Sequence, residues 1–100
     1  MRLTNSERKV MQVLWSEGDT TAKRIAEILA TTTGWCKTTT YTIIKKCSEK
    51  RAIERVEPNW LCRPLVSKKE AQQFAITDLA DKMFDGSTDQ LVKFIKEMKD

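Results

Sequence analysis

The chain has 100 residues, of which 40% are hydrophobic and 32% are charged, with 3 glycines and 2 prolines. That composition is typical of one folded domain, or of a small domain with an oligomerisation segment, and leaves no room for a second complete enzyme domain. The sequence contains neither an apolar run near the roughly 20 residues that span a bilayer nor an apolar stretch typical of a signal peptide, so we expect a cytoplasmic protein without a membrane partner.

The net charge of +4 is unevenly distributed. Residues 1–66 hold 12 Lys and Arg against 7 Asp and Glu, whereas residues 67–100 hold 6 against 7. A basic front part favours a polyanion as partner, and a nearly neutral tail suits packing against protein.

The sequence lacks the residue patterns that are typical of metal sites and of enzymes. The three cysteines, Cys36, Cys47 and Cys62, form no CxxC pair, and the chain has no histidine. The usual zinc ligand sets cannot be assembled from these residues, so we expect no metal and no cofactor. The sequence also lacks a G-x-S-x-G motif and a phosphate-cradling glycine loop, which argues against an enzyme.

Capping signals and apolar spacing predict two helices at the start of the chain. Thr4 followed by Glu7 fits a capping box, and the first helix should end near Gly18. Residues 19–21 offer N-caps for a second helix, whose apolar stripe runs from residue 22 to residue 29. We expect this helix to stop before the TTTG sequence at residues 31–34.

The stretch WCKTTTYTIIKKC, residues 35–47, predicts a third helix that runs to about Lys50. Four of its residues, Thr40, Ile43, Ile44 and Cys47, fall at i, i+3, i+4 and i+7, which is one face of a helix. The opposite face carries hydroxyl and ammonium groups, which suit phosphates and base edges of DNA. The candidate DNA-binding residues of this helix are Thr38, Thr39, Tyr41, Thr42, Lys45 and Lys46.

Two short segments around the turn-prone pair Pro58-Asn59 predict a two-stranded hairpin. Pro64 cannot donate a ladder hydrogen bond, so the second strand should be short or lie at an edge. Three helices followed by such a hairpin form a winged helix-turn-helix, which predicts a DNA-binding domain over residues 1–66. Its wing adds three candidate DNA-binding residues: Arg55, Asn59 and Arg63.

Residues 67–100 predict two further helices, opened by capping boxes at Ser67 with Glu70 and at Ser87 with Gln90. The first should reach Gly86, and the second should run to the end of the chain. Their apolar residues need burial, for which we favour a second copy of the chain. The predicted dimerisation residues are Phe74, Leu79, Met83, Leu91, Phe94, Ile95 and Met98. The fold class is thus mainly α with a small β-hairpin, a winged helix-turn-helix followed by C-terminal dimerisation helices.

Several assignments keep an alternative. Trp60 is either an anchor between wing and core or an exposed wing tip. A thiol at a helix N-terminus has a depressed pKa, so Cys36 opens the alternative of DNA binding that responds to redox conditions. A winged helix can also serve as a protein-interaction module, but that use predicts a neutral or acidic third helix, and Lys45, Lys46 and Lys50 argue against it.

Four runs of sequence resemble the penicillinase-repressor (BlaI/MecI/CopY) family over nearly the whole chain: VMQVLW (10–15), WCKTTTYTIIKKCSEKRAI (35–53), PLVSKKE (64–70) and MFDGS (83–87). The resemblance implies a bacterial winged-helix transcriptional repressor that dimerises through C-terminal helices and binds an inverted-repeat operator in double-stranded DNA. It also implies release by a signal, through an upstream sensor or protease.

By position, the third helix corresponds to the family's recognition helix, and Thr39, Thr42 and Lys45 match the family's threonines and lysine. Thr38 and Tyr41 stand where the family usually has a lysine and an arginine or another polar residue. The resemblance therefore implies a base preference that differs from that of penicillinase operators.

Other departures concern the ends of the third helix and the signal. Cys36-Lys37 replaces a frequent Ser-Pro pair, so we expect Thr38 or Thr39 to cap the helix. Arg51 replaces a common turn glycine, which predicts a less tight turn. The cysteine-rich CxCxxxxCxC motif of copper-sensing members is absent from the sequence given. The Lys93-Phe94 bond stands where β-lactam-responsive members are cleaved between an asparagine and a phenylalanine.

Overall fold

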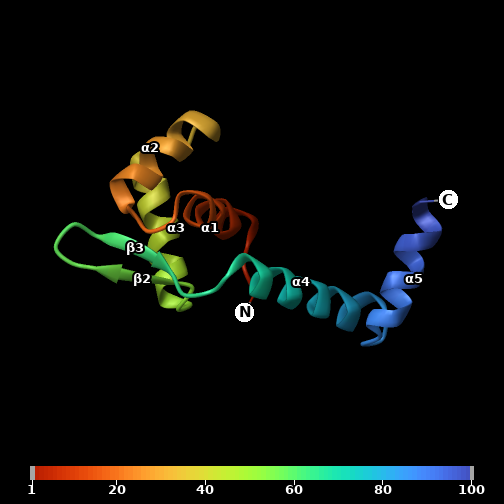
Figure 1. The fold of residues 1–100 in the computed structure, drawn as a ribbon. Helices are drawn as coiled ribbons and strands as arrows, with labels where there is room; N and C mark the ends of the chain where they lie inside the picture. The colour runs from red at the N-terminus through yellow and green to blue at the C-terminus, as the bar shows by residue number, and fades with distance from the viewer. Residues whose placement is uncertain (1, 100) are drawn as a thin grey trace. The chain divides into compact units, whose positions relative to one another are not determined.

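The computed structural model describes residues 2–99, which form five helices and one small three-stranded antiparallel sheet (Figure 1). The chain divides into two compact units, residues 3–68 and residues 69–99. The first unit contains three helices and the sheet, and the second contains most of α4 and the last helix.

Helix α1 spans Asn5–Glu17 and begins with the predicted capping box. The Thr4 hydroxyl accepts the Glu7 N–H at 3.2 Å, and the Glu7 carboxylate accepts the Thr4 N–H at 2.8 Å. Gly18, with a φ of 82°, ends the helix as expected. Two orphan amides of the first turn are thereby satisfied, which fixes where α1 starts.

Helix α2 spans Ala22–Thr32, with Thr21 as its N-cap. The expectation that it stops before residue 31 was wrong. The hydroxyls of Thr31 and Thr32 donate to the carbonyls four residues earlier, at 3.2 and 3.0 Å. These bonds are compatible with helix geometry, so threonines read as a break in the sequence continue the helix instead.

Helix α3 spans Lys37–Glu49 and presents the predicted face to the core. Thr40, Ile44 and Cys47 are each at most 1% exposed, and Ile43 is half-buried against the same core. The Thr40 hydroxyl has no hydrogen-bond partner among the described residues. Residues 35–47 thus form a helix although they are rich in β-branched residues, because packing of the buried face outweighs intrinsic propensity.

The sheet consists of β1 (Thr20–Thr21), β2 (Ile53–Val56) and β3 (Leu61–Pro64), in the order β1-β3-β2. The predicted hairpin of β2 and β3 is present, and β1 was not predicted. The second strand was expected to be short or to lie at an edge, and β3 is short, with four residues, in the middle of the sheet. Pro64 is its last residue and pairs with Ile53. We call β2, β3 and the turn between them the wing.

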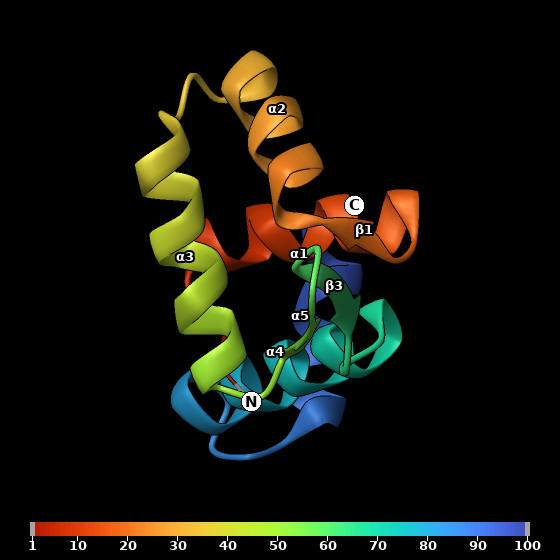
Figure 2. The ribbon, with the colours of Figure 1, turned by 90° about the vertical axis from the view of Figure 1, so that its left-hand side faces the viewer.

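The core of the first unit lies between α1, α2, α3 and the sheet, as Figure 2 shows from the side of the wing. Trp15 lies half-buried against this core, and its indole N–H donates to the Val66 carbonyl at 2.9 Å. The fully buried residues with the largest side chains include Met11, Leu14, Ile25, Ile44 and Ile53. This packing leaves the opposite face of α3 uncovered by the rest of the unit.

The second unit is built from α4 (Lys68–Met83) and α5 (Thr88–Lys99). The Ser87 hydroxyl accepts the Gln90 N–H at 3.1 Å and caps α5. The rings of Phe84 and Phe94 lie 5.7 Å apart between centroids. Helix α4 ends at Met83, a turn before the predicted Gly86. None of the helices within residues 2–99 combines the length and apolar character that crossing a membrane requires.

Candidate nucleic-acid interface

The face of α3 that points away from the core exposes Thr38, Thr39, Thr42, Lys45 and Lys46. We call these five residues the α3 face. The Thr42 hydroxyl donates to the Thr38 carbonyl at 2.9 Å, which leaves its oxygen able to accept. Hydroxyls, threonine methyls and ammonium groups on one exposed helix surface match the groups that contact phosphates and base edges in a DNA groove.

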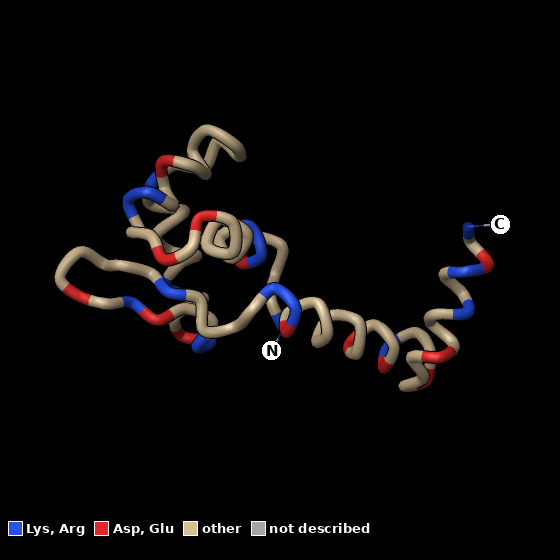
Figure 3. Tube along the Cα trace, in the orientation of Figure 1, with Lys and Arg blue, Asp and Glu red and all other residues tan. Residues whose placement is uncertain are grey.

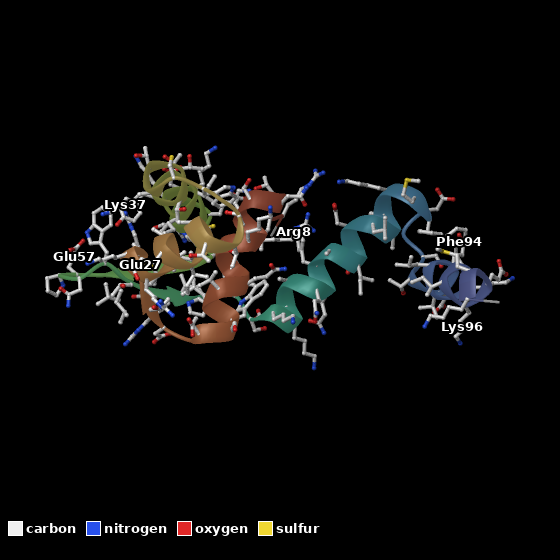
Figure 4. The ribbon with its side chains drawn as sticks, turned by 90° about the horizontal axis from the view of Figure 1, so that it is seen from above. Arg8, Glu27, Lys37, Glu57, Phe94 and Lys96 are labelled. Carbon is white, nitrogen blue, oxygen red and sulfur yellow. The ribbon has the colours of Figure 1, made fainter. Side chains whose placement is uncertain are left out.

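The start of α3 departs from the expected capping. Cys36, and not Thr38 or Thr39, is the N-cap, and it makes no capping hydrogen bond through its side chain. The first helical residue, Lys37, therefore adds its charge at the positive end of the helix, where amides are directed outward. Figure 4 marks Lys37 at this end of α3.

Tyr41 lies on the same helix but is half-buried and contacts the wing. Its ring meets the Trp60 ring edge-on, with centroids 6.2 Å apart and an interplanar angle of 66°. The Lys37 ammonium lies 5.5 Å from the centre of the Tyr41 ring, and the Arg55 guanidinium lies 5.0 Å from the centre of the Trp60 ring. Two cations and two rings thus connect the first half of α3 to the wing.

Lys37 and Trp60 were not among the predicted DNA-binding residues. The spacing of four between Lys37 and Tyr41 could have indicated their contact, because residues at i and i+4 are neighbours on a helix. The contact of Trp60 with Tyr41 joins residues far apart in the sequence, and no local pattern contains it. Trp60 is 41% exposed, in agreement with the exposed wing tip among its two alternatives, and its ring contacts Tyr41 of α3.

The wing carries the three predicted polar residues, but with different surroundings. Asn59 is exposed in the turn between β2 and β3, and Arg55 is exposed on β2. Arg63 forms an ion pair with Asp19, with 3.2 Å between Nε and the carboxylate. Acidic residues alternate with basic ones along β2 and the following turn, as Figure 3 shows. The wing is therefore less basic than α3.

Lys50 pairs with a buried carboxylate and does not belong to the α3 face. Its Nζ lies 2.7 Å from a carboxylate oxygen of Glu7, whose side chain is 2% exposed. Burial by itself raises the pKa of Glu7, but the hydrogen bonds from Lys50 and Thr4 outweigh it, and the pKa lies below its usual 4.5. The pair ties the start of α1 to the end of α3.

The three thiols differ in reactivity. Burial raises the pKa of Cys47 to about 12 and also raises the pKa of Cys62. Cys36 is exposed, and its Sγ lies 3.2 Å from the Thr39 hydroxyl. The Thr39 hydroxyl, first of all, and the nearby backbone N–H groups at the start of α3 lower the pKa of the Cys36 thiol. Within residues 2–99, no group of three or more cysteine, aspartate or glutamate side chains is placed to hold a metal ion.

The predicted dimerisation residues separate into two sets. Leu91 is 4% exposed, so it belongs to the interior of the chain and is not available to a second copy. The other six side chains are exposed: Phe74, Leu79, Met83, Phe94, Ile95 and Met98. Ile76 and Val92 are also exposed apolar residues of these helices and were not predicted.

The sequence model of the penicillinase repressor family matches residues 3–99. No curated protein matches the chain. The match covers both units, and the observed order of three helices, a wing and two further helices is consistent with the winged-helix pattern of that family. Members are transcriptional repressors that bind operator DNA, and they are not enzymes. The chain belongs to the penicillinase repressor family.

Proposed function

We propose that the chain represses transcription as a homodimer on an inverted-repeat operator, with α3 in the major groove of each half-site and the wing on the sugar-phosphate backbone. Membership of the family supports the repressor activity. The observation that carries the DNA-binding geometry is the α3 face, five exposed hydroxyl and ammonium side chains on the helix surface opposite the core.

Lysines and threonines of the α3 face make different contacts with DNA: lysines position the protein on the backbone, and threonines can also recognise bases. Lysine ammonium groups such as those of Lys45 and Lys46 bind phosphates and release counterions. Threonine hydroxyls bond either phosphates or base edges, and threonine methyls contact the methyl group of thymine. The α3 face therefore favours operators with thymines opposite Thr38, Thr39 or Thr42.

The three polar residues of the wing contribute unequally to DNA binding in this arrangement. Arg55 and Asn59 are exposed and can approach a phosphate directly. Arg63 is paired with Asp19 and has to share or exchange that partner to bind DNA, which lowers its contribution. A signal that weakens the dimer or its hold on the operator, delivered by an upstream sensor or protease, would then release the promoter.

The experiment that tests this function measures binding of the purified chain to the DNA upstream of its own gene as a function of salt. Lys45→Ala and Lys46→Ala should each weaken binding and each reduce the slope of log K against log salt by about 2, because one phosphate contact is lost in each of the two half-sites. Fluorescence anisotropy with labelled duplex gives both quantities.

Lys96→Ala is the matched control, since it removes the same charge from an exposed position on α5 (Figure 4). Its salt slope should equal that of the unchanged chain. Absence of binding by the unchanged chain, or equal slopes for all three variants, would contradict the proposal.

A further inference from the structure

The ring contact between Tyr41 and Trp60 is a direct side-chain link between α3 and the wing. Tyr41 stands between Thr38 and Thr42 in the sequence, yet it is half-buried where those threonines are exposed. Its ring is covered on one side by Lys37 and met edge-on by Trp60. An edge-to-face arrangement at this separation is favourable beyond simple burial.

A hydrogen bond from the start of α2 holds the backbone of Trp60. Its carbonyl accepts the N–H of Ala22, the first residue of α2, at 3.1 Å. Trp60 has a φ of 51°, in the left-handed region that a bulky side chain rarely adopts. Strained backbone of this kind persists where surrounding contacts hold it, and at Trp60 those contacts come from α2, α3 and β2.

We propose that Tyr41 and Trp60 are positioning residues that brace the wing against α3, so that Lys37 and Arg55 meet the DNA backbone in fixed register with the α3 face. This inference rests on the proposed function. It gives Tyr41 a different role from the DNA contact expected from the sequence, because the ring acts and the hydroxyl does not.

The arrangement of charge supports this role. Arg55 lies against the Trp60 ring and Lys37 against the Tyr41 ring, so each cation is held where its ring is held. A wing that moved independently would have to be ordered when DNA binds, and that ordering would cost affinity. The two rings reduce this cost because they order the wing beforehand.

The test combines conservative and disruptive variants in the binding assay. Tyr41→Phe and Trp60→Phe keep a ring and should bind within about twofold of the unchanged chain. Tyr41→Leu and Trp60→Leu remove a ring, and each should weaken binding about fivefold. The double leucine variant should also lose about fivefold, and not the product of the two losses, because both changes remove one shared contact.

The salt slope separates bracing from a general loss of stability. Both leucine variants should show a smaller slope, because Lys37 and Arg55 lose their positions, whereas both phenylalanine variants keep it. Equal losses for Tyr41→Phe and Tyr41→Leu would instead show that the hydroxyl contacts DNA. Losses that multiply in the double variant would show that the rings act independently. Either result overturns the brace.

A measurement on the free protein tests the contact between α3 and the wing independently of DNA binding. In the free protein, Tyr41→Leu should shift the amide resonances of residues 53–64, and Tyr41→Phe should leave them nearly unchanged. Unchanged wing resonances in the leucine variant would overturn the brace even if the chain binds its operator. Shifted resonances in a chain that binds no DNA would leave the brace standing and reject the repressor geometry.

Discussion

At the scale of single residues, Arg51 shows how a residue other than glycine can end a helix in a tight turn. After α3, the Ala52 N–H donates to the Cys47 carbonyl at 2.9 Å and the Arg51 N–H donates to the Ser48 carbonyl at 3.0 Å. These two bonds form the Schellman ending, which places one residue in the left-handed region. Arg51 occupies it with a φ of 62°. The expectation of a less tight turn was therefore wrong.

The cost of this conformation gives a prediction. Arg51→Gly should raise the free energy of unfolding by about 1 kcal/mol, because glycine adopts a positive φ without a Cβ clash. Urea denaturation measures the change. Arg51→Ala is the control: it removes the same charged side chain but keeps the Cβ, so it should give no comparable gain. A gain of equal size in both variants would point to relief of charge repulsion instead of backbone strain.

Single residues were also where sequence reasoning was least complete. Cys36 was recognised as a thiol of lowered pKa, but not as the N-cap of α3, because cysteine is not a usual capping residue. The ion pair of Arg63 with Asp19 and the bond of Lys50 to Glu7 join positions far apart in the chain. Such pairs depend on the fold, so residue type alone cannot show which cations remain available to DNA.

At the scale of elements, the Glu7–Lys50 pair couples α1 to α3. The pKa of Glu7 is lower in the folded chain than its usual 4.5, so folding favours the ionised carboxylate. Its contribution to stability is fully present above about pH 4.5 and is lost as the pH falls through the lowered value. Acid should therefore loosen the anchorage of α3.

Replacing Glu7 by glutamine tests this coupling. Glu7→Gln should be less stable than the unchanged chain at pH 7, and the difference should shrink as the pH falls below about 4.5. Urea unfolding at several pH values measures it. Glu49→Gln, which changes an exposed carboxylate on α3, serves as the control. A difference for Glu7→Gln that stays constant from pH 7 to pH 3 would contradict the assignment.

Elements with a clear apolar period were predictable, and those that depend on a distant partner were not. The spacing of Thr40, Ile44 and Cys47 predicted α3 and its buried face, because the helical period can be recognised within a short stretch of sequence. The strand β1 has two residues and exists only because Thr20 and Thr21 pair with Cys62 and Leu61. The same limit applies to the Tyr41–Trp60 contact that joins α3 to the wing.

At the scale of the whole molecule, the uneven charge agrees with a division of roles between the two units. The basic residues 1–66 include the α3 face and the wing, whereas the nearly neutral remainder carries exposed apolar side chains on α4 and α5. Phe94, Ile95 and Met98 remain between 44% and 71% exposed in the single chain. Exposed apolar side chains grouped on neighbouring helices are typical of a surface that a partner covers.

Dimerisation through these helices is tested by mass. The 11.5 kDa chain should sediment as a species of twice that mass, and Ile95→Asp or Met98→Asp should shift it toward the mass of one chain. A charge buried in an apolar interface is strongly unfavourable, which is the physical reason for the shift. Lys96→Ala should remain dimeric. Aspartate variants with the same mass as the unchanged chain would place the dimer interface elsewhere.

The most direct test of the central claim compares binding of the unchanged chain to the DNA upstream of its own gene and to a scrambled duplex of the same length and composition. At physiological salt, a repressor that reads bases through the α3 face should bind the upstream DNA at least about a thousandfold more tightly. Equal affinity for the two duplexes would mean that the lysines hold phosphates without reading sequence, and would contradict the account.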